Sequence, residues 1–142
     1  MSLFARKPEP VEAFPFTRTD AEWKAMLTAE QFKVMRGHGT EGACTSPLNA
    51  EKRDGTYACA GCSQALFKTE AKFESGTGWP SFFQPIVRDA VATTDDRAWG
   101  MVRTEVHCSN CGSHLGHVFP DGPAPTGLRY CMNGVSLTFQ PA

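Results

Sequence analysis

Cysteine is the residue type whose spacing in this sequence most clearly indicates chemistry. The chain has six cysteines, and four of them form two C-x-x-C pairs, Cys59 with Cys62 and Cys108 with Cys111. A C-x-x-C turn lets two thiolates reach one ion, so two such turns supply the four sulfur ligands of a tetrahedral zinc site. We therefore predict that these four cysteines bind zinc.

Two local disulfides or a thioredoxin-like redox pair are the alternatives for these cysteines. The N-terminus is broken up by prolines and lacks the apolar region of a signal peptide, and no strand-helix-strand pattern surrounds the pairs. Both observations favour zinc. Four cysteine ligands leave no position for a catalytic water, so this zinc would be structural. Residues 63–107 separate the pairs, so the site would tie together strands that are distant in sequence.

The other two cysteines, Cys44 and Cys131, remain for chemistry or for packing. Either could be a small buried hydrophobic residue, as free cysteines often are. The neighbours of Cys131 favour chemistry. His114 and His117 precede it in the sequence, and Arg129 lies two residues before it. A thiol is nucleophilic as the thiolate, and nearby imidazole or guanidinium charge lowers its pKa.

Two further stretches would complete a site around Cys131. Residues 128–139 are β-prone, and alternate residues of a strand point to the same face. Arg129, Cys131 and Asn133 would then line one surface. Trp79 lies in a turn rich in glycine and proline. Core packing is one interpretation of this tryptophan, and the wall of a small apolar pocket is the other.

Two short helices are predicted before the cysteine pairs. Thr19 with Glu22, and Thr28 with Gln31, have the spacing of capping boxes, and Gly37 occupies the place of a C-terminal cap. The apolar residues of both helices predict their buried side, and these are Trp23, Met26, Leu27, Phe32 and Met35.

From Gly55 onward the chain consists of short β-prone segments between Gly, Pro, Asn and Asp, which is typical of antiparallel sheets. We predict a mainly β fold with two short N-terminal helices. The 142 residues suit one domain, which we place at residues 18–142 behind a proline-containing arm, residues 1–17.

The charge and hydropathy of the chain argue against several partners. Lys and Arg number 14 against 15 Asp and Glu, so no positive surplus is available for nucleic acid or an anionic membrane. No apolar run approaches the length of a membrane span. We expect a soluble protein of the reducing cytoplasm.

Four motifs together resemble one known family. The segment SGTGWPSF, the two C-x-x-C pairs, GSHLGHVFPDGP and LRYCMNGVSL are similar to those of B-type methionine sulfoxide reductases, which reduce the R epimer of methionine sulfoxide. The similarity covers about residues 23–139. It implies two curved antiparallel sheets, a fold called the β-tent, closed by a zinc site remote from the active site.

The resemblance also implies roles for individual residues. Cys131 would be the nucleophile, with His114 and His117 as the paired active-site histidines and Asn133 beside them. Substrate binding would involve Trp79, which matches a residue that packs on the substrate methyl group, with Phe119, Asp121 and Arg129 nearby. Attack of Cys131 on the sulfoxide sulfur would form a sulfenic acid and release methionine, and a second thiol would convert it to a disulfide that thioredoxin reduces.

This sequence departs from the family pattern at the second thiol. Many members carry that cysteine just before the tryptophan, where this chain has Thr77. Cys44 is the remaining candidate, and the alternative is direct attack by an external thiol. Two other functions stay open on the residues alone. One is a zinc-binding interaction module without catalysis, and the other is a thiol peroxidase that uses Cys131 and Cys44.

Overall fold

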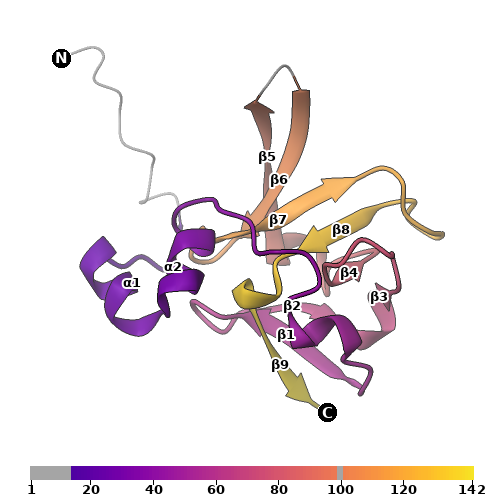
Figure 1. The fold of residues 1–142 in the computed structure, drawn as a ribbon, viewed down its shortest axis with the longest axis horizontal. Coiled ribbons are helices and arrows are strands. Elements are labelled where there is room, and N and C mark those ends of the chain that lie inside the picture. The colour runs from indigo at the N-terminus through magenta and orange to yellow at the C-terminus, as the bar shows by residue number, and fades with distance from the viewer. Residues whose placement is uncertain (1–13, 99–100) are drawn as a thin grey trace.

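The structure is a computed structural model that describes residues 14–98 and 101–142. Two helices, α1 (Asp20–Met26) and α2 (Ala29–Met35), lie to one side of a β body (Figure 1). The strands are β1 (Gly55–Cys59), β2 (Ala65–Lys68), β3 (Lys72–Phe73), β4 (Ser81–Phe82), β5 (Val91–Ala98), β6 (Met101–Cys108), β7 (His114–Phe119), β8 (Arg129–Met132) and β9 (Leu137–Pro141). The predicted mainly β fold with two short helices is confirmed.

Both predicted capping boxes are present. The Thr19 hydroxyl accepts a hydrogen bond from the Glu22 backbone, and the Glu22 carboxylate accepts one from the Thr19 backbone. Thr28 and Gln31 repeat this arrangement at the start of α2. Gly37 directly follows the C-cap residue Arg36, as predicted, but the left-handed residue after α2 is His38 (φ 57°). Gly37 is needed for close approach instead, because a Cβ there would lie 2.6 Å from the Lys33 carbonyl oxygen.

The buried side of the helices was predicted in part. Trp23, Leu27 and Met35 are buried and Phe32 packs against the core, but Met26 is 42% exposed. Each helix has only two turns, so few of its residues can face the body. Val34, which the prediction omitted, is buried in place of Met26.

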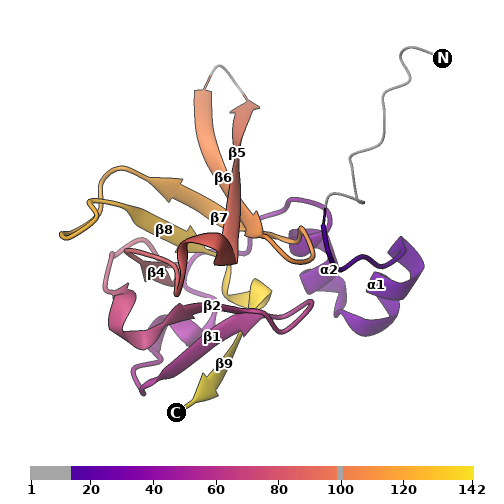
Figure 2. The same cartoon turned by 180° about the vertical axis from the view of Figure 1, so that it is seen from behind.

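The strands form two antiparallel sheets. The smaller sheet has the order β2-β1-β9, and the larger has the order β3-β4-β8-β7-β6-β5. The long β5 and β6 strands extend beyond the rest of the larger sheet, as the front and rear views show (Figures 1 and 2). Within the described residues, no helix combines the length and apolar character that a bilayer crossing needs.

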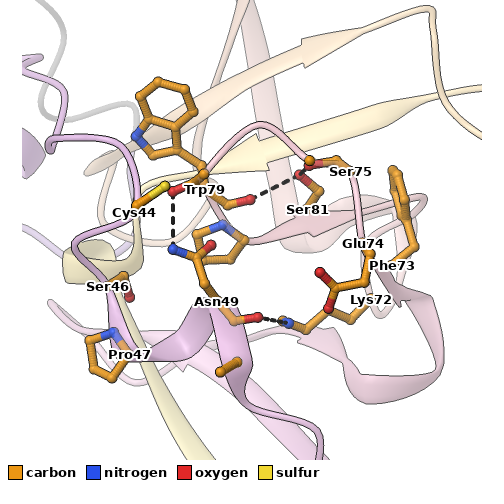
Figure 3. A pocket seen from close by; sticks show the side chains of 14 residues that line it. Cys44, Ser46, Pro47, Asn49, Lys72, Phe73, Glu74, Ser75, Trp79 and Ser81 are labelled. Carbon is orange, nitrogen blue, oxygen red and sulfur yellow. Dashed lines mark hydrogen bonds between the residues drawn. The ribbon is translucent and has the colours of Figure 1, made fainter.

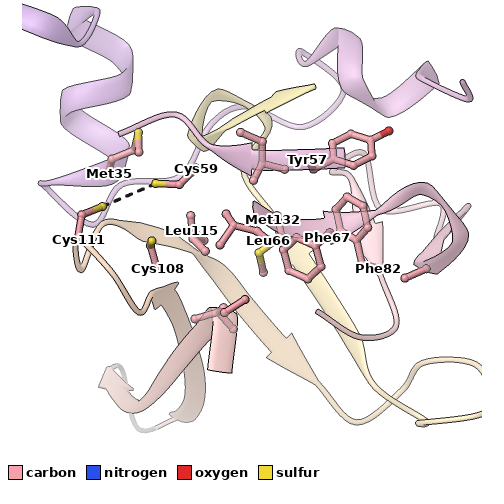
Figure 4. Packing of buried hydrophobic residues seen from close by; sticks show 14 of the residues in the cluster. Met35, Tyr57, Cys59, Leu66, Phe67, Phe82, Cys108, Cys111, Leu115 and Met132 are labelled. Atoms are coloured by element: carbon pink, nitrogen blue, oxygen red, sulfur yellow. Dashed lines mark hydrogen bonds between the residues drawn. The ribbon is translucent and has the colours of Figure 1, made fainter. Parts of the chain in front are cut away.

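The core fills the space between the two sheets (Figure 4). Tyr57 and Phe67 from the smaller sheet meet Phe82 from the larger one, with ring centroids 5.0 and 4.3 Å apart. Leu115 and Met132 are fully buried in the same cluster. This aromatic packing stabilises the sheets against each other and fixes the position of β8, the strand that carries Cys131.

Residues 128–139 do not form the single strand that the sequence predicted. β8 ends at Met132, a 3₁₀ turn covers Gly134–Ser136, and β9 then joins the other sheet. The chain therefore changes sheets directly after the active-site strand. Residues 14–17 of the predicted arm contact the body, since the Phe16 N–H donates to the Asn110 carbonyl, and residues 1–13 lie outside the described part. The division into arm and domain stays a prediction.

Candidate active site

Cys131 lies in β8, between two neighbouring strands of the larger sheet. The register places Ser81 of β4 opposite it on one side and His117 of β7 opposite it on the other. Directly opposed residues of antiparallel strands have Cβ atoms about 4.5–5.5 Å apart on one face. The sheet therefore presents an imidazole and a hydroxyl next to the thiol.

The alternation of side chains along β8 determines which face of the sheet carries the Cys131 thiol. Met132 is part of the core between the sheets, and Tyr130 packs against that core. Since successive side chains of a strand point to opposite faces, Cys131 and Arg129 face away from the smaller sheet. Cys131 is half-buried there.

Burial dominates the acidity of this thiol. Desolvation raises the pKa of Cys131 above its ordinary value of 9.0, although contacts from Thr77, Arg129 and Ser81 act in the opposite direction. The Thr77 hydroxyl lies 3.9 Å from the sulfur. The expected low pKa from neighbouring imidazoles is therefore not found, because burial outweighs the charge of Arg129. A raised pKa makes the thiol the favoured form of Cys131 at neutral pH.

Arg129 is held in place beside the thiol. Its guanidinium lies 4.4 Å above the Phe119 ring, and it donates two hydrogen bonds to the Asp121 carboxylate at 2.9 and 3.2 Å. The hydrogen bond from Arg129 lowers the pKa of Asp121. Phe119, Asp121 and Arg129 thus form one connected unit at the start of β8, and within it the Arg129 charge favours the thiolate form of Cys131.

Trp79 is fixed at the entrance to β4 by a single backbone group. Its indole N–H donates to the Glu41 carbonyl oxygen at 3.0 Å. The following residue, Pro80, is buried, and its carbonyl accepts from the Met132 N–H. The tryptophan is half-buried rather than part of the core, and its place in the wall of a substrate pocket stays a prediction.

Asn133 does not share a strand face with Cys131, contrary to the sequence prediction. It follows the last residue of β8, is buried, and donates to the Leu115 carbonyl at 3.0 Å. Its side-chain oxygen accepts from the Glu41 N–H at 2.8 Å. Its contacts with protein fix the backbone next to the nucleophile, so the structure gives it a positioning role.

His114 and His117 have different surroundings. Their rings meet edge to face with centroids 5.5 Å apart. His114 is buried, and its Nδ1 lies 2.6 Å from the Glu105 carboxylate, which also lies 2.8 Å from His38 Nδ1. Burial alone would raise the pKa of Glu105, but hydrogen bonds from His114 and His38 lower it far below its usual range. Glu105 is therefore an anion that orients His114, while His117 is the histidine beside the thiol.

Cys44 lies on the other side of the segment that carries Trp79. The Cys44 N–H donates to the Gly78 carbonyl at 2.7 Å, and a Cβ on Gly78 would lie 3.0 Å from the Cys44 sulfur. Cys44 is exposed and has a left-handed backbone (φ 65°). It borders a pocket of about 330 Å³ that Asn49, Lys72 and Trp79 also line (Figure 3). The segment 75–79 thus contacts Cys131 through Thr77 and Cys44 through Gly78.

The four paired cysteines converge at one point, as the sequence predicted. The four sulfurs lie within 4.8 Å of one another, and two pairs, Cys59 with Cys111 and Cys62 with Cys108, are 3.7 and 3.6 Å apart. Sulfur ligands about 2.3 Å from a tetrahedral zinc are about 3.8 Å apart, whereas a disulfide bond is about 2.05 Å long. Spacing and donor type both fit a metal ion. The four cysteines are positioned to hold one.

Two acidic residues of the site, Glu41 and Glu105, were missed by the sequence analysis. Glu41 lies in an irregular loop and binds residues more than 90 positions away, while Glu105 lies in a strand and contacts His38 and His114 through the fold. The only local signal was a carboxylate close to Cys44 in the case of Glu41, and an acid within a β-prone segment in the case of Glu105. Neither pattern indicates a buried partner.

Comparison with known proteins identifies related chains. The family model of the SelR domain matches residues 27–141. The "Peptide methionine sulfoxide reductase MsrB" of Agrobacterium fabrum is 52% identical over 124 residues, which cover 87% of this chain and 92% of that protein. The protein of the same name from Pseudomonas putida is 56% identical over 124 residues, covering 87% and 93%. That of Methanosarcina barkeri is 54% identical over 123 residues, covering 87% of each.

The raised pKa of Cys131 predicts slow alkylation at neutral pH. In the Cys44→Ser protein, the iodoacetamide rate at Cys131, followed by mass spectrometry, should rise with pH to a midpoint above 9.0, because only the thiolate reacts. Arg129→Met should move this midpoint higher, since the guanidinium charge favours the thiolate. Arg97→Met, at an exposed position on β5, is the matched control and should leave it unchanged. A midpoint below 9.0 in the parent protein would contradict the burial argument.

Proposed function

The chain belongs to the SelR-domain family of MsrB-type methionine sulfoxide reductases, and from this we propose that it reduces methionine-R-sulfoxide to methionine with Cys131 as nucleophile. The observation that supports this most directly is the register of β8, which brings Cys131 between His117 and Ser81. The choice of the R epimer rests on the resemblance to the family. Free and protein-bound methionine sulfoxide are both candidate substrates in the repair of oxidised methionine.

The site residues divide the work of binding as follows. Trp79, fixed through its indole N–H, offers an apolar face for the substrate methyl group. Phe119, at the end of β7, and the Arg129–Asp121 pair, at the start of β8, border the thiol. A sulfoxide combines an apolar methyl group with a strongly accepting oxygen, so a site with one aromatic wall and adjacent polar groups matches it.

The first chemical step transfers oxygen from methionine to Cys131. His117 donates a proton to the sulfoxide oxygen, which makes the substrate sulfur electrophilic, and general acid help of this kind is typically worth roughly 10²–10⁴ in rate. The Cys131 sulfur attacks the substrate sulfur and forms an S–S bond, while the thiol proton passes to His117 and restores the acid. The protonated oxygen then bonds to the Cys131 sulfur as the S–S bond and the substrate S–O bond break, so methionine leaves and Cys131 is a sulfenic acid. Glu105 keeps His114 oriented beside His117 during this step.

The second step needs a thiol, and we assign it to Cys44. Its thiolate displaces the oxygen of the sulfenic acid as water and forms a Cys44–Cys131 disulfide, which the two thiols of thioredoxin reduce by exchange. The segment 75–79 contacts both cysteines and has to move for the sulfurs to meet. The left-handed backbone of Cys44 costs about 1–3 kcal/mol, which a rearranged loop would regain.

We assign the metal at the cysteine cluster as a structural zinc ion. Four thiolates satisfy its coordination, so it stabilises the fold and leaves the redox chemistry to Cys131. Hydrogen bonds among the four sulfurs, led by those to Cys108, raise the pKa of Cys59 and lower that of Cys62. Zinc would replace these shared protons. We place the protein in the reducing cytoplasm, where cysteines serve metal binding or chemistry rather than structural disulfides.

A single-turnover assay tests the reaction. The reduced protein, mixed with racemic methionine sulfoxide and no recycling reductant, should release about one methionine per chain and consume only the R epimer. Chiral chromatography measures both. Cys131→Ser should release none while its zinc content stays unchanged. Failure of the parent protein to consume either epimer would exclude the reductase function.

Replacement of Cys44 tests the second thiol. Cys44→Ser should still release methionine in a single turnover but should not turn over with thioredoxin, because the sulfenic acid has no partner within the chain. Trapping the sulfenic acid with dimedone, detected by mass spectrometry, should succeed in this variant. Thr45→Ser is a conservative neighbouring control in the same loop. Normal recycling of Cys44→Ser by thioredoxin would favour an external thiol instead.

Loss of a metal ligand should affect the whole domain. Cys108→Ser is expected to release zinc and to lower the free energy of unfolding by more than about 4 kcal/mol, since loss of a structural metal is among the largest effects of a single substitution. Atomic emission for zinc and urea denaturation measure the two quantities. Retention of a full equivalent of zinc in Cys108→Ser would show that the cluster does not bind it.

A further inference from the structure

A second group of metal-binding side chains lies next to the active site. His38, Glu105 and His114 bring two imidazole nitrogens and a carboxylate oxygen within 4.8 Å of one another. Both nitrogens are Nδ1 atoms, and both contact the same oxygen, Glu105 Oε2, at 2.8 and 2.6 Å. The three residues come from the loop after α2, from β6 and from β7, so the fold gathers them from distant parts of the sequence.

We propose that His38, Glu105 and His114 bind a divalent transition-metal ion, and that the bound ion inhibits the reductase by tying up His114. The inhibitory half of this proposal rests on the proposed function. Two imidazoles and one carboxylate form a set of nitrogen and oxygen ligands that suits Zn²⁺, Ni²⁺ or Cu²⁺, and it is chemically distinct from the four sulfurs of the cysteine cluster.

The geometry needs only a small adjustment to accept an ion. Ligand atoms about 2.0–2.2 Å from a metal lie about 3–3.5 Å apart, so each nitrogen must move less than about 1 Å away from the carboxylate oxygen. The side chain of His38 is 64% exposed and can make such a movement, whereas that of His114 is 2% exposed and forms the fixed part of the site. The protons now shared in these contacts would be released on binding.

The surroundings allow entry and further ligands. The three residues line an open pocket of about 320 Å³ together with Thr40, Arg103 and His117. Water can therefore complete the coordination of an ion. Glu105 supplies a negative charge, and Arg103 opposes it with a positive one. We expect the Arg103 charge to limit the affinity without blocking the site.

Inhibition follows from what the ion does to His114. A metal ion on Nδ1 takes the position of the carboxylate hydrogen bond that orients the His114 ring, whose centroid lies 5.5 Å from that of His117. Because the His114 ring packs edge to face on His117, a His114 ring that is turned toward the ion no longer holds His117, the expected proton donor, in its place beside the thiol. The rate of methionine release should therefore fall when the site is filled.

Binding is tested without the catalytic thiols. Zinc-loaded Cys44→Ser/Cys131→Ser protein should bind one equivalent of Ni²⁺ in equilibrium dialysis, with its zinc content unchanged and X-ray absorption showing only nitrogen and oxygen neighbours around nickel. His38→Asn in the same background should weaken binding by at least about tenfold, the lower range even for outer-sphere partners of a metal. His107→Asn, which alters the one histidine outside the pocket, is the matched control and should bind as the parent does. Absence of a nickel equivalent, or equal affinity in the His38→Asn and His107→Asn proteins, would overturn the site.

Inhibition is tested in the active protein. The single-turnover rate should fall as Ni²⁺ is added, over the concentration range in which nickel fills the site. His38→Asn should raise the inhibitory nickel concentration by the same factor by which it raises the dissociation constant. Nickel binding in the thiol-free protein without any effect on turnover would overturn the inhibitory role alone. The nickel-binding measurement in the Cys44→Ser/Cys131→Ser protein needs no turnover. Absence of the proposed reductase activity would therefore not be mistaken for absence of the metal site.

Discussion

The buried carboxylate of Glu41 holds together the parts of the molecule that meet at Cys131. It accepts hydrogen bonds from the N–H groups of Gly134 and Val135 at 2.8 and 3.0 Å, directly after the active-site strand. Its own backbone binds the Trp79 indole through the carbonyl and the Asn133 side chain through the N–H. Desolvation raises the pKa of Glu41 although the two N–H groups act against it. A costly buried acid is retained because it places the pocket wall and the turn beyond the nucleophile with one residue.

The cysteine cluster constrains the other end of the same sheet. Cys108 ends β6, Cys111 lies in the following turn, and β7 begins three residues later at His114. The pairing of β6 with β7 shifts register between Val106 and His107, which is where a clamped turn has to accommodate an extra residue. A metal ion on the four sulfurs would therefore fix the relation between β6 and β7. That relation sets the contact of Glu105 with His114, so the proposed zinc ion would influence the active site through the register of these two strands.

The sequence predicted best the features that depend on local spacing. The capping boxes at Thr19 and Thr28 and the convergence of the paired cysteines need only a fixed separation along the chain. The strand containing Cys131 was extended too far, because β-propensity continues through residues 133–136 while the backbone turns to change sheets. Glu41 was missed because Asn133, Gly134 and Val135, which it binds, lie far away in sequence. Glu105 was missed because its contact with His114, nine residues later, depends on the pairing of β6 with β7. The direction of the Cys131 pKa was missed for a related reason, since burial is a property of the fold and not of neighbouring residues.

A nucleophile that is protonated at rest has consequences for the proposed reaction. A permanent thiolate would react with peroxides and other oxidants that reach the pocket, and an over-oxidised cysteine is lost to catalysis. Burial raises the pKa of Cys131 and favours the unreactive thiol form, while contacts with Thr77, Arg129 and Ser81 favour the thiolate. A bound sulfoxide changes this balance, because its oxygen accepts a proton and its sulfur accepts the electron pair of the cysteine. The thiol is then activated by the substrate that it reduces, and the same burial that slows its general reactivity provides the selectivity.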